Sequence, residues 1–157
     1  MKSPVYRFYV EPNLGERRGI ELAFPRLADI ARAEESNRVT VFSYSKDNLD
    51  GSELQDYFGQ ETIIPWQRSG SKSLVRFDGL LLPRIGSSTI YRATIRGLVL
   101  VLYPTREMLA KLDRQLQVTA VGRVGWYSLD DAKEWIVQWS AEPVLDEESN
   151  ENQAQVR

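Results

Sequence analysis

The chain has 157 residues, with 20 lysines and arginines, 22 aspartates and glutamates, no histidine and no cysteine. A chain of this length is expected to form one domain around one sizeable core. The missing imidazole and thiol groups exclude serine–histidine and cysteine–histidine nucleophiles, ordinary structural zinc sites, disulfides and haem ligated by histidine or cysteine. An enzyme of this composition would depend on carboxylates, lysine, arginine, tyrosine or an oxygen-ligated metal.

The first elements are expected to follow one another as strand, helix and strand. Val5–Val10 is rich in β-branched and aromatic residues, which predicts a strand. Apolar residues at helical spacing over Phe24–Ala31 predict an amphipathic helix, in which Pro25 suits an early position and which Glu35–Asn37 closes. Arg38–Tyr44 is expected to be a second strand.

The middle of the chain is rich in strand signals. Ser52 is expected to cap a short helix over Glu53–Phe58. Three strand-like segments follow, at Thr62–Trp66, Leu74–Leu82 and Thr89–Ile95.

A hairpin is expected from the second and third of these segments. Pro83–Gly86 lies between them and contains the Pro and Gly that a four-residue turn favours. If the strands pair symmetrically about this turn, Asp78 lies opposite Arg92 and forms a cross-strand pair of opposite charge.

The last third alternates between strand and helix. Leu98–Tyr103 is a continuous apolar run, typical of a strand covered on both faces, and Thr105 can cap the helix that follows it. Val118–Val124 is a further strand, and Ser128 begins a final helix whose apolar stripe runs from Leu129 to Trp139. This order predicts an α/β fold: a mostly parallel sheet with helices on its faces and an inserted antiparallel hairpin.

Charge is distributed unevenly along the chain. The segment Pro65–Tyr127 holds ten basic and three acidic residues, a net charge of +7, whereas the two flanks together carry −9. The carboxyl-terminal stretch Glu142–Arg157 is acidic and has few large apolar side chains. It therefore cannot bury enough apolar surface to offset the entropy that it would lose on becoming ordered. We therefore expect one domain over residues 1–142 and a disordered acidic tail over residues 143–157.

One candidate site lies at the carboxyl ends of the parallel strands, where helix amino termini also point. Its polar and basic residues would suit a small anion such as phosphate, and carboxylates in the same loops could hold Mg²⁺. The sequence contains neither a dinucleotide-binding glycine motif nor a P-loop, so no cofactor is expected. The expected anion-binding residues are Lys46, Thr105, Arg106 and Ser128.

The arginine-rich hairpin is the second candidate site. Its arginines and interleaved aromatic residues could lie along a nucleic-acid backbone or an acidic protein surface. The alternative is that these arginines pair with the acidic flanks and only cover the sheet. The expected partner-binding residues are Arg76, Arg84, Arg92 and Arg96, with Tyr91 and Trp66.

The four tryptophans divide into two groups. Trp135 and Trp139 lie four residues apart on the predicted final helix, which favours packing in the core. Trp66 and Trp126 lie at strand ends, where exposure would make them anchors for a partner.

Two functions from different classes follow. The favoured one is a non-enzymatic accessory or adaptor domain that binds nucleic acid or an acidic protein surface through the arginine hairpin. The alternative is a small-anion sensor or Mg²⁺-dependent enzyme at the strand ends. The apolar runs are too short for a membrane helix or a signal peptide, so we expect a cytoplasmic location; the oligomeric state stays open, a homo-oligomer included.

Overall fold

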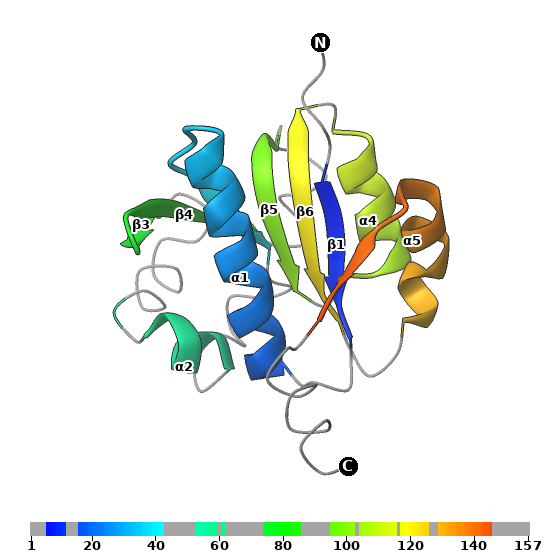
Figure 1. The fold of residues 1–157 in the computed structure, drawn as a ribbon, viewed down its shortest axis with the longest axis horizontal. Helices are drawn as coiled ribbons and strands as arrows, with labels where there is room; N and C mark the ends of the chain where they lie inside the picture. Colours follow the sequence, from blue (N-terminus) through cyan, green and yellow to red (C-terminus); the bar gives the residue numbers. More distant parts are fainter. Residues whose placement is uncertain are drawn as a thin grey trace.

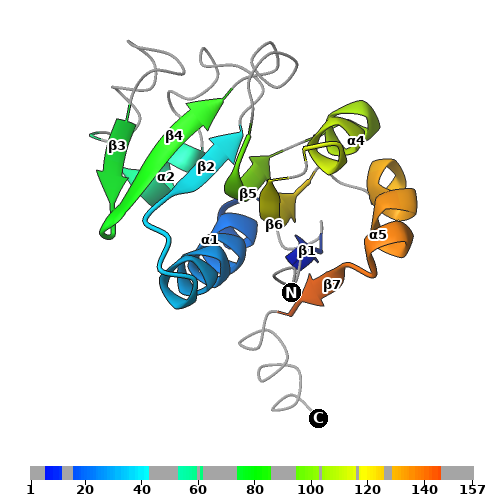
Figure 2. The ribbon, with the colours of Figure 1, turned by 90° about the horizontal axis from the view of Figure 1, so that it is seen from above.

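The computed structural model describes residues 6–11, 16–42, 53–59, 61, 74–85, 95–102, 104–115, 117–125 and 129–145. Over these residues the chain forms a seven-stranded sheet in the order β3-β4-β2-β5-β6-β1-β7 (Figures 1 and 2). Every pair of neighbours is parallel except β3 and β4. The strands are β1 (Tyr6–Val10), β2 (Val39–Phe42), β3 (Leu74–Phe77), β4 (Leu80–Ile85), β5 (Gly97–Leu102), β6 (Val118–Val124) and β7 (Glu142–Val144).

Helices cover both faces of the sheet, which confirms the predicted α/β class (Figure 2). On one face lies α1 (Glu16–Ala33), with α2 (Glu53–Phe58) packed against it. On the other face lie α4 (Arg106–Asp113) and α5 (Lys133–Trp139), the latter preceded by a single 3-10 turn, η5 (Asp130–Ala132).

The central strand β5 contributes to the cores on both faces. Leu98, Leu100 and Leu102 pack on the α1 side, whereas Val99 and Val101 pack against α4. All five side chains are almost completely buried. Because strand side chains alternate between the two faces, a strand covered on both sides must be apolar at every position.

Helix α1 is longer than the sequence predicted. It begins at Glu16, so Pro25 lies inside the helix and not near its start. Pro25 faces solvent, while Phe24 and Leu27 beside it are buried against the sheet, and this packing holds the helix together where Pro25 cannot donate a backbone hydrogen bond. The predicted end is confirmed: Glu35 is left-handed at φ 57°, and the Ser36 amide donates to the Ala31 carbonyl at 2.7 Å.

The hairpin turn lies earlier than predicted. Asp78 and Gly79 form it, with φ angles of 52° and 77°, and this two-residue turn joins β3 to β4. Left-handed φ angles at both positions suit a tight hairpin, and Asp followed by Gly tolerates them well. Pro83 therefore lies within β4, and the predicted turn at residues 83–86 is wrong over the part that the structure describes.

The expected cross-strand pairing of Asp78 with Arg92 fails at Asp78, which lies in the turn and not in a strand. The Asp78 carboxylate instead accepts a hydrogen bond from the Arg32 guanidinium of α1 at 2.8 Å. Arg92 lies outside the described residues, as do the predicted strand Thr62–Trp66 and most of Thr89–Ile95. Ile95 is described, but it lies just before β5 and not in a strand.

Several bounds in the rest of the chain match the prediction. Helix α2 and strand β6 have the expected limits, and the Thr105 hydroxyl caps α4 by accepting a hydrogen bond from the Met108 amide at 3.2 Å. At the end of the chain, Pro143 and Val144 belong to β7, which pairs with β1. The predicted acidic tail included these two residues; those after residue 145 lie outside the described part.

None of the helices in the described ranges is long and apolar enough to cross a membrane.

The left-handed turn predicts a specific sensitivity at Gly79. Gly79→Ala should lower the free energy of unfolding by about 1 kcal/mol or more, because a Cβ is strained at positive φ. Urea unfolding measures this. Asp78→Asn is the matched control and should cost less, because Asn tolerates this conformation. Equal losses for the two variants would contradict the turn geometry.

Candidate functional site

The structure separates the predicted partner-binding arginines. Arg76 is exposed in β3, and Arg96 is exposed just before β5. Arg84 lies near the carboxyl end of β4, whereas Arg96 lies at the amino end of β5, so these two are at opposite edges of parallel strands. Arg92, Tyr91 and Trp66 lie outside the described residues, as does Trp126.

Arg76 shares a row of the sheet with an arginine that the sequence analysis did not select. Arg76 of β3 pairs with Leu81 of β4, and Leu81 forms a parallel bridge with Arg38 at the start of β2. We call Arg76, Leu81 and Arg38 the arginine row. Two strand spacings of about 4.8 Å place the two arginine backbones about 10 Å apart. Arg96 lies at the same amino edge, one strand further along.

The side chains of the arginine row point away from α1. Val75 and Phe77, on either side of Arg76, pack on the α1 side of the sheet, so Arg76 projects to the opposite face. The same alternation applies to Leu81, whose neighbours Leu80 and Leu82 pack towards α1. Arg38 precedes Val39, which also packs on that side. The row therefore presents two exposed guanidinium groups and a half-buried leucine on one face.

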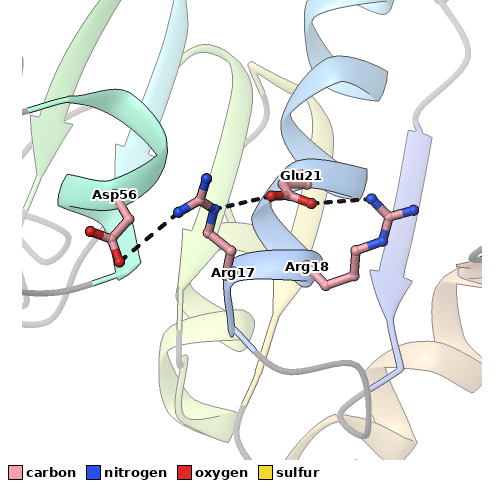
Figure 3. Close-up of polar contacts among 4 residues, drawn as sticks. All are labelled: Arg17, Arg18, Glu21 and Asp56. Carbon is pink, nitrogen blue, oxygen red and sulfur yellow. Dashed lines mark hydrogen bonds and ion pairs between the residues drawn. The ribbon is translucent and has the colours of Figure 1, made fainter.

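The surface arginines of α1 are already paired with carboxylates. At the start of α1, Glu21 accepts hydrogen bonds from Arg17 at 3.0 Å and from Arg18 at 3.1 Å (Figure 3). These bonds hold the pKa of Glu21 below its usual value. Asp56 of α2 lies 4.0 Å from Arg17 on its other side. This cluster links α1 to α2.

Two arginines further along α1 are also paired with carboxylates. Arg26 contacts Glu142 of β7 at 2.8 Å, and Arg32 contacts Asp78 in the hairpin turn. By contrast, no carboxylate of the described residues lies within 4.0 Å of the Arg38, Arg76 or Arg96 guanidinium. Pairing with acidic residues thus accounts for the arginines of α1 but, over this part of the chain, not for those three.

The predicted anion site at the carboxyl ends of the strands is described only in part. Thr105 and Arg106 lie at the start of α4, but Lys46 and Ser128 lie outside the described residues. The Thr105 hydroxyl is engaged as the cap of α4. Arg106 is exposed, and its Nη2 atom donates to the Asp130 carbonyl at the limiting distance of 3.5 Å.

The chain connections favour a ligand at this edge. The connection after β1 crosses the α1 face towards β2, whereas the connection after β6 crosses the α5 face towards β7. Neighbouring strands whose connections leave over opposite faces form the switch point at which α/β sheets bind ligands.

Arg123 lies near this switch point but is not exposed there. It is level with Tyr9 of β1 and Val101 of β5 and is only 1% exposed. A Cβ at position 125 would overlap the Arg123 guanidinium, so Gly125 provides the space in which this side chain lies. Burial of a guanidinium in this position is a feature that the sequence analysis did not predict.

A second buried arginine lies on the α5 side of β1. Arg7 is 4.0 Å from Asp113 of α4, and its guanidinium lies 4.4 Å from the ring centre of Trp139. Burial lowers the pKa of Arg7 and raises the pKa of Asp113. In each group this effect of burial is larger than the opposite effect of their mutual attraction. Trp135 and Trp139 also pack in this core, as predicted. The Arg7 side chain is 2% exposed and that of Asp113 is 14% exposed, so both lie largely in the interior.

Over the described residues, no three carboxylates gather in a way that could hold a metal ion. Comparisons of the chain with protein-family models, with curated proteins and with solved structures found no match.

The raised pKa of Asp113 predicts a pH dependence of stability. The folded state binds a proton on Asp113 more tightly than the unfolded state does. Protonation of Asp113 therefore stabilises the folded state at acid pH, and this stabilisation is lost as pH rises through the folded-state pKa. The free energy of unfolding of the wild type, minus that of Asp113→Asn, should therefore increase as pH falls from about 7 to about 3. Urea unfolding across this range measures it, and parallel curves would contradict the assignment.

Proposed function

We propose that this protein is a non-enzymatic accessory domain that binds an anionic macromolecular partner through Arg38, Arg76 and Arg96. The observation that carries the proposal is the arginine row: two exposed guanidinium groups flank Leu81 on one face, and no carboxylate in the described parts of the chain pairs with them. Either a nucleic-acid backbone or an acidic protein surface would supply the missing negative charge.

The composition of the row suits a binding surface. Arginine presents five donors in a planar group, which matches the oxygens of carboxylates and phosphates. Leu81 is half-buried between the two arginines, so a partner could cover apolar surface while it neutralises the charges. Arginine is one of the residue types enriched among those that dominate binding energy at interfaces.

Replacing the three arginines tests the proposal. For a single-stranded oligonucleotide, the triple variant Arg38→Ala, Arg76→Ala, Arg96→Ala should reduce the salt dependence of binding, with a slope of log K against log salt that is smaller by roughly two. For polyglutamate, the same variant should bind more weakly. Fluorescence anisotropy at several salt concentrations measures both.

The matched control removes three positive charges from α1. Arg17→Ala, Arg18→Ala, Arg26→Ala changes the net charge by the same amount, but these arginines are already paired with carboxylates. This control should leave binding of the anionic polymer close to that of the wild type. Equal losses in the two triple variants would show an effect of net charge alone and would contradict the proposal, as would unchanged binding in the first.

A small-anion sensor is the second candidate function. The observation that favours it is the exposed Arg106 at the start of α4, on the edge of the sheet where β1 and β6 form the switch point. The backbone N–H groups of the first turn of a helix, together with a guanidinium, suit a phosphate or carboxylate group.

Thermal unfolding with added inorganic phosphate tests the second candidate. Phosphate should raise the melting temperature of the wild type, because a ligand that binds only the folded state stabilises it. Arg106→Ala should abolish this shift, whereas Arg114→Ala at the other end of α4 should preserve it. The absence of any phosphate-dependent shift in the wild type would refute the anion-sensor function.

A further inference from the structure

The backbone of Arg76 faces the outer edge of the sheet. The Leu81 amide donates to the Asn37 carbonyl at 2.7 Å, so it points towards β2 and away from β3. Arg76 and Leu81 are therefore a non-hydrogen-bonded pair of the hairpin. This is the expected pattern, because Phe77 and Leu80 close the two-residue turn as a hydrogen-bonded pair and the two kinds of pair alternate along the strands. In such a pair the N–H and C=O groups of both residues point away from each other. Those of Arg76 thus point outward, beyond β3.

Among the described strands, β3 pairs only with β4, so its outer edge offers these backbone groups. An edge of this kind can accept another extended chain, which continues the sheet by backbone hydrogen bonds. Specificity then comes from the side chains that lie next to those of the edge strand.

The two faces of β3 differ sharply in chemistry. Arg76 is exposed on one face, whereas half-buried Val75 and Phe77 lie on the other. Phe77 contacts an aromatic cluster in which its ring centre lies 5.0 Å from that of Phe58 and 5.6 Å from that of Phe24. A strand added beside β3 would place one side chain next to Arg76 and its two neighbours next to Val75 and Phe77.

We propose that the partner of the arginine row is a protein that adds an extended segment to the outer edge of β3, with an acidic residue beside Arg76 and an apolar residue on each side of it. This inference rests on the proposed function and names its partner class. Charge complementarity selects the acidic residue, since no carboxylate of the described chain lies within 4.0 Å of Arg76, and the Val75–Phe77 face selects the apolar ones.

A synthetic peptide of alternating valine and glutamate provides the probe. It should bind the wild type, as measured by fluorescence anisotropy, and a peptide with lysine in place of glutamate should not. Arg76→Ala removes the charge but keeps the outward N–H, and should weaken binding about fivefold. Arg76→Pro removes the charge and also the outward N–H, and should weaken binding about fivefold more than Arg76→Ala does.

Arg76→Pro is compatible with the hairpin because the Arg76 amide donates no hydrogen bond to β4. Thermal unfolding checks that the variant folds. If it does not, the same peptide methylated on the amides that face β3 replaces it, and this peptide should bind the wild type more weakly than the unmethylated one. Arg26→Ala is the matched control: Arg26 is paired with Glu142 of β7, at the opposite end of the sheet from β3, so its removal should leave peptide binding unaffected.

The outcomes separate this inference from the proposed function. Equal binding by Arg76→Ala and Arg76→Pro, together with equal binding of the methylated peptide, would overturn strand addition. If the oligonucleotide binds through the three arginines and the peptide does not, the inference is wrong while the proposed function stands. If the three arginines are needed for binding none of the three probes (the oligonucleotide, polyglutamate and the peptide), the inference and the proposed function are both wrong.

Discussion

The two-residue turn at Asp78 and Gly79 determines which side chains this end of the sheet exposes. Its left-handed backbone places Phe77 opposite Leu80 and Arg76 opposite Leu81, and this register directs Val75 and Phe77 towards α1. A shift of one residue would reverse every side chain of β3, because strand side chains alternate between faces. The position of Arg76 on the open face, and its alignment with Arg38, both depend on this turn.

The distribution of ion pairs gives the arginine row its significance. The arginines of α1 contact carboxylates of α1 itself, of α2, of the hairpin turn and of β7. These contacts are on the surface, where each adds little stability, but together they leave α1 with few uncompensated charges. Arg32 forms an ion pair with the turn residue Asp78, on the side of the hairpin opposite to Arg76. A slightly acidic protein therefore still presents positive charge on one face.

The parts that could be predicted from sequence were those with local signals. The continuous apolar run before Tyr103, the cap at Thr105 and the apolar stripe of the last helix each specify an element without help from the rest of the chain. Pro25 and Pro83 misled because proline usually ends or begins an element. In this fold, the packing of α1 on the sheet and the pairing of β4 with β2 outweigh that local preference.

The candidate site was harder to predict because it depends on pairing between distant strands. Arg76 was selected for its place in an arginine-rich segment, but Arg38 belongs to another part of the chain, and only the bridge through Leu81 brings the two into one row. The Asp78–Gly79 dipeptide was the available signal, since Asp-Gly between apolar runs is typical of a tight hairpin. The buried positions of Arg7 and Arg123 had no such signal, because exposed and buried arginines look alike in a sequence.

The central claim is that the arginine row and Arg96 bind an anionic partner. An NMR titration that follows the arginine Nε–H resonances while polyglutamate is added tests it most directly. The account predicts that the signals of Arg38, Arg76 and Arg96 shift with a common dissociation constant, while those of the paired Arg17 and Arg26 stay in place. Shifts confined to Arg106 and the first amides of α4, or equal shifts across all surface arginines, would contradict it.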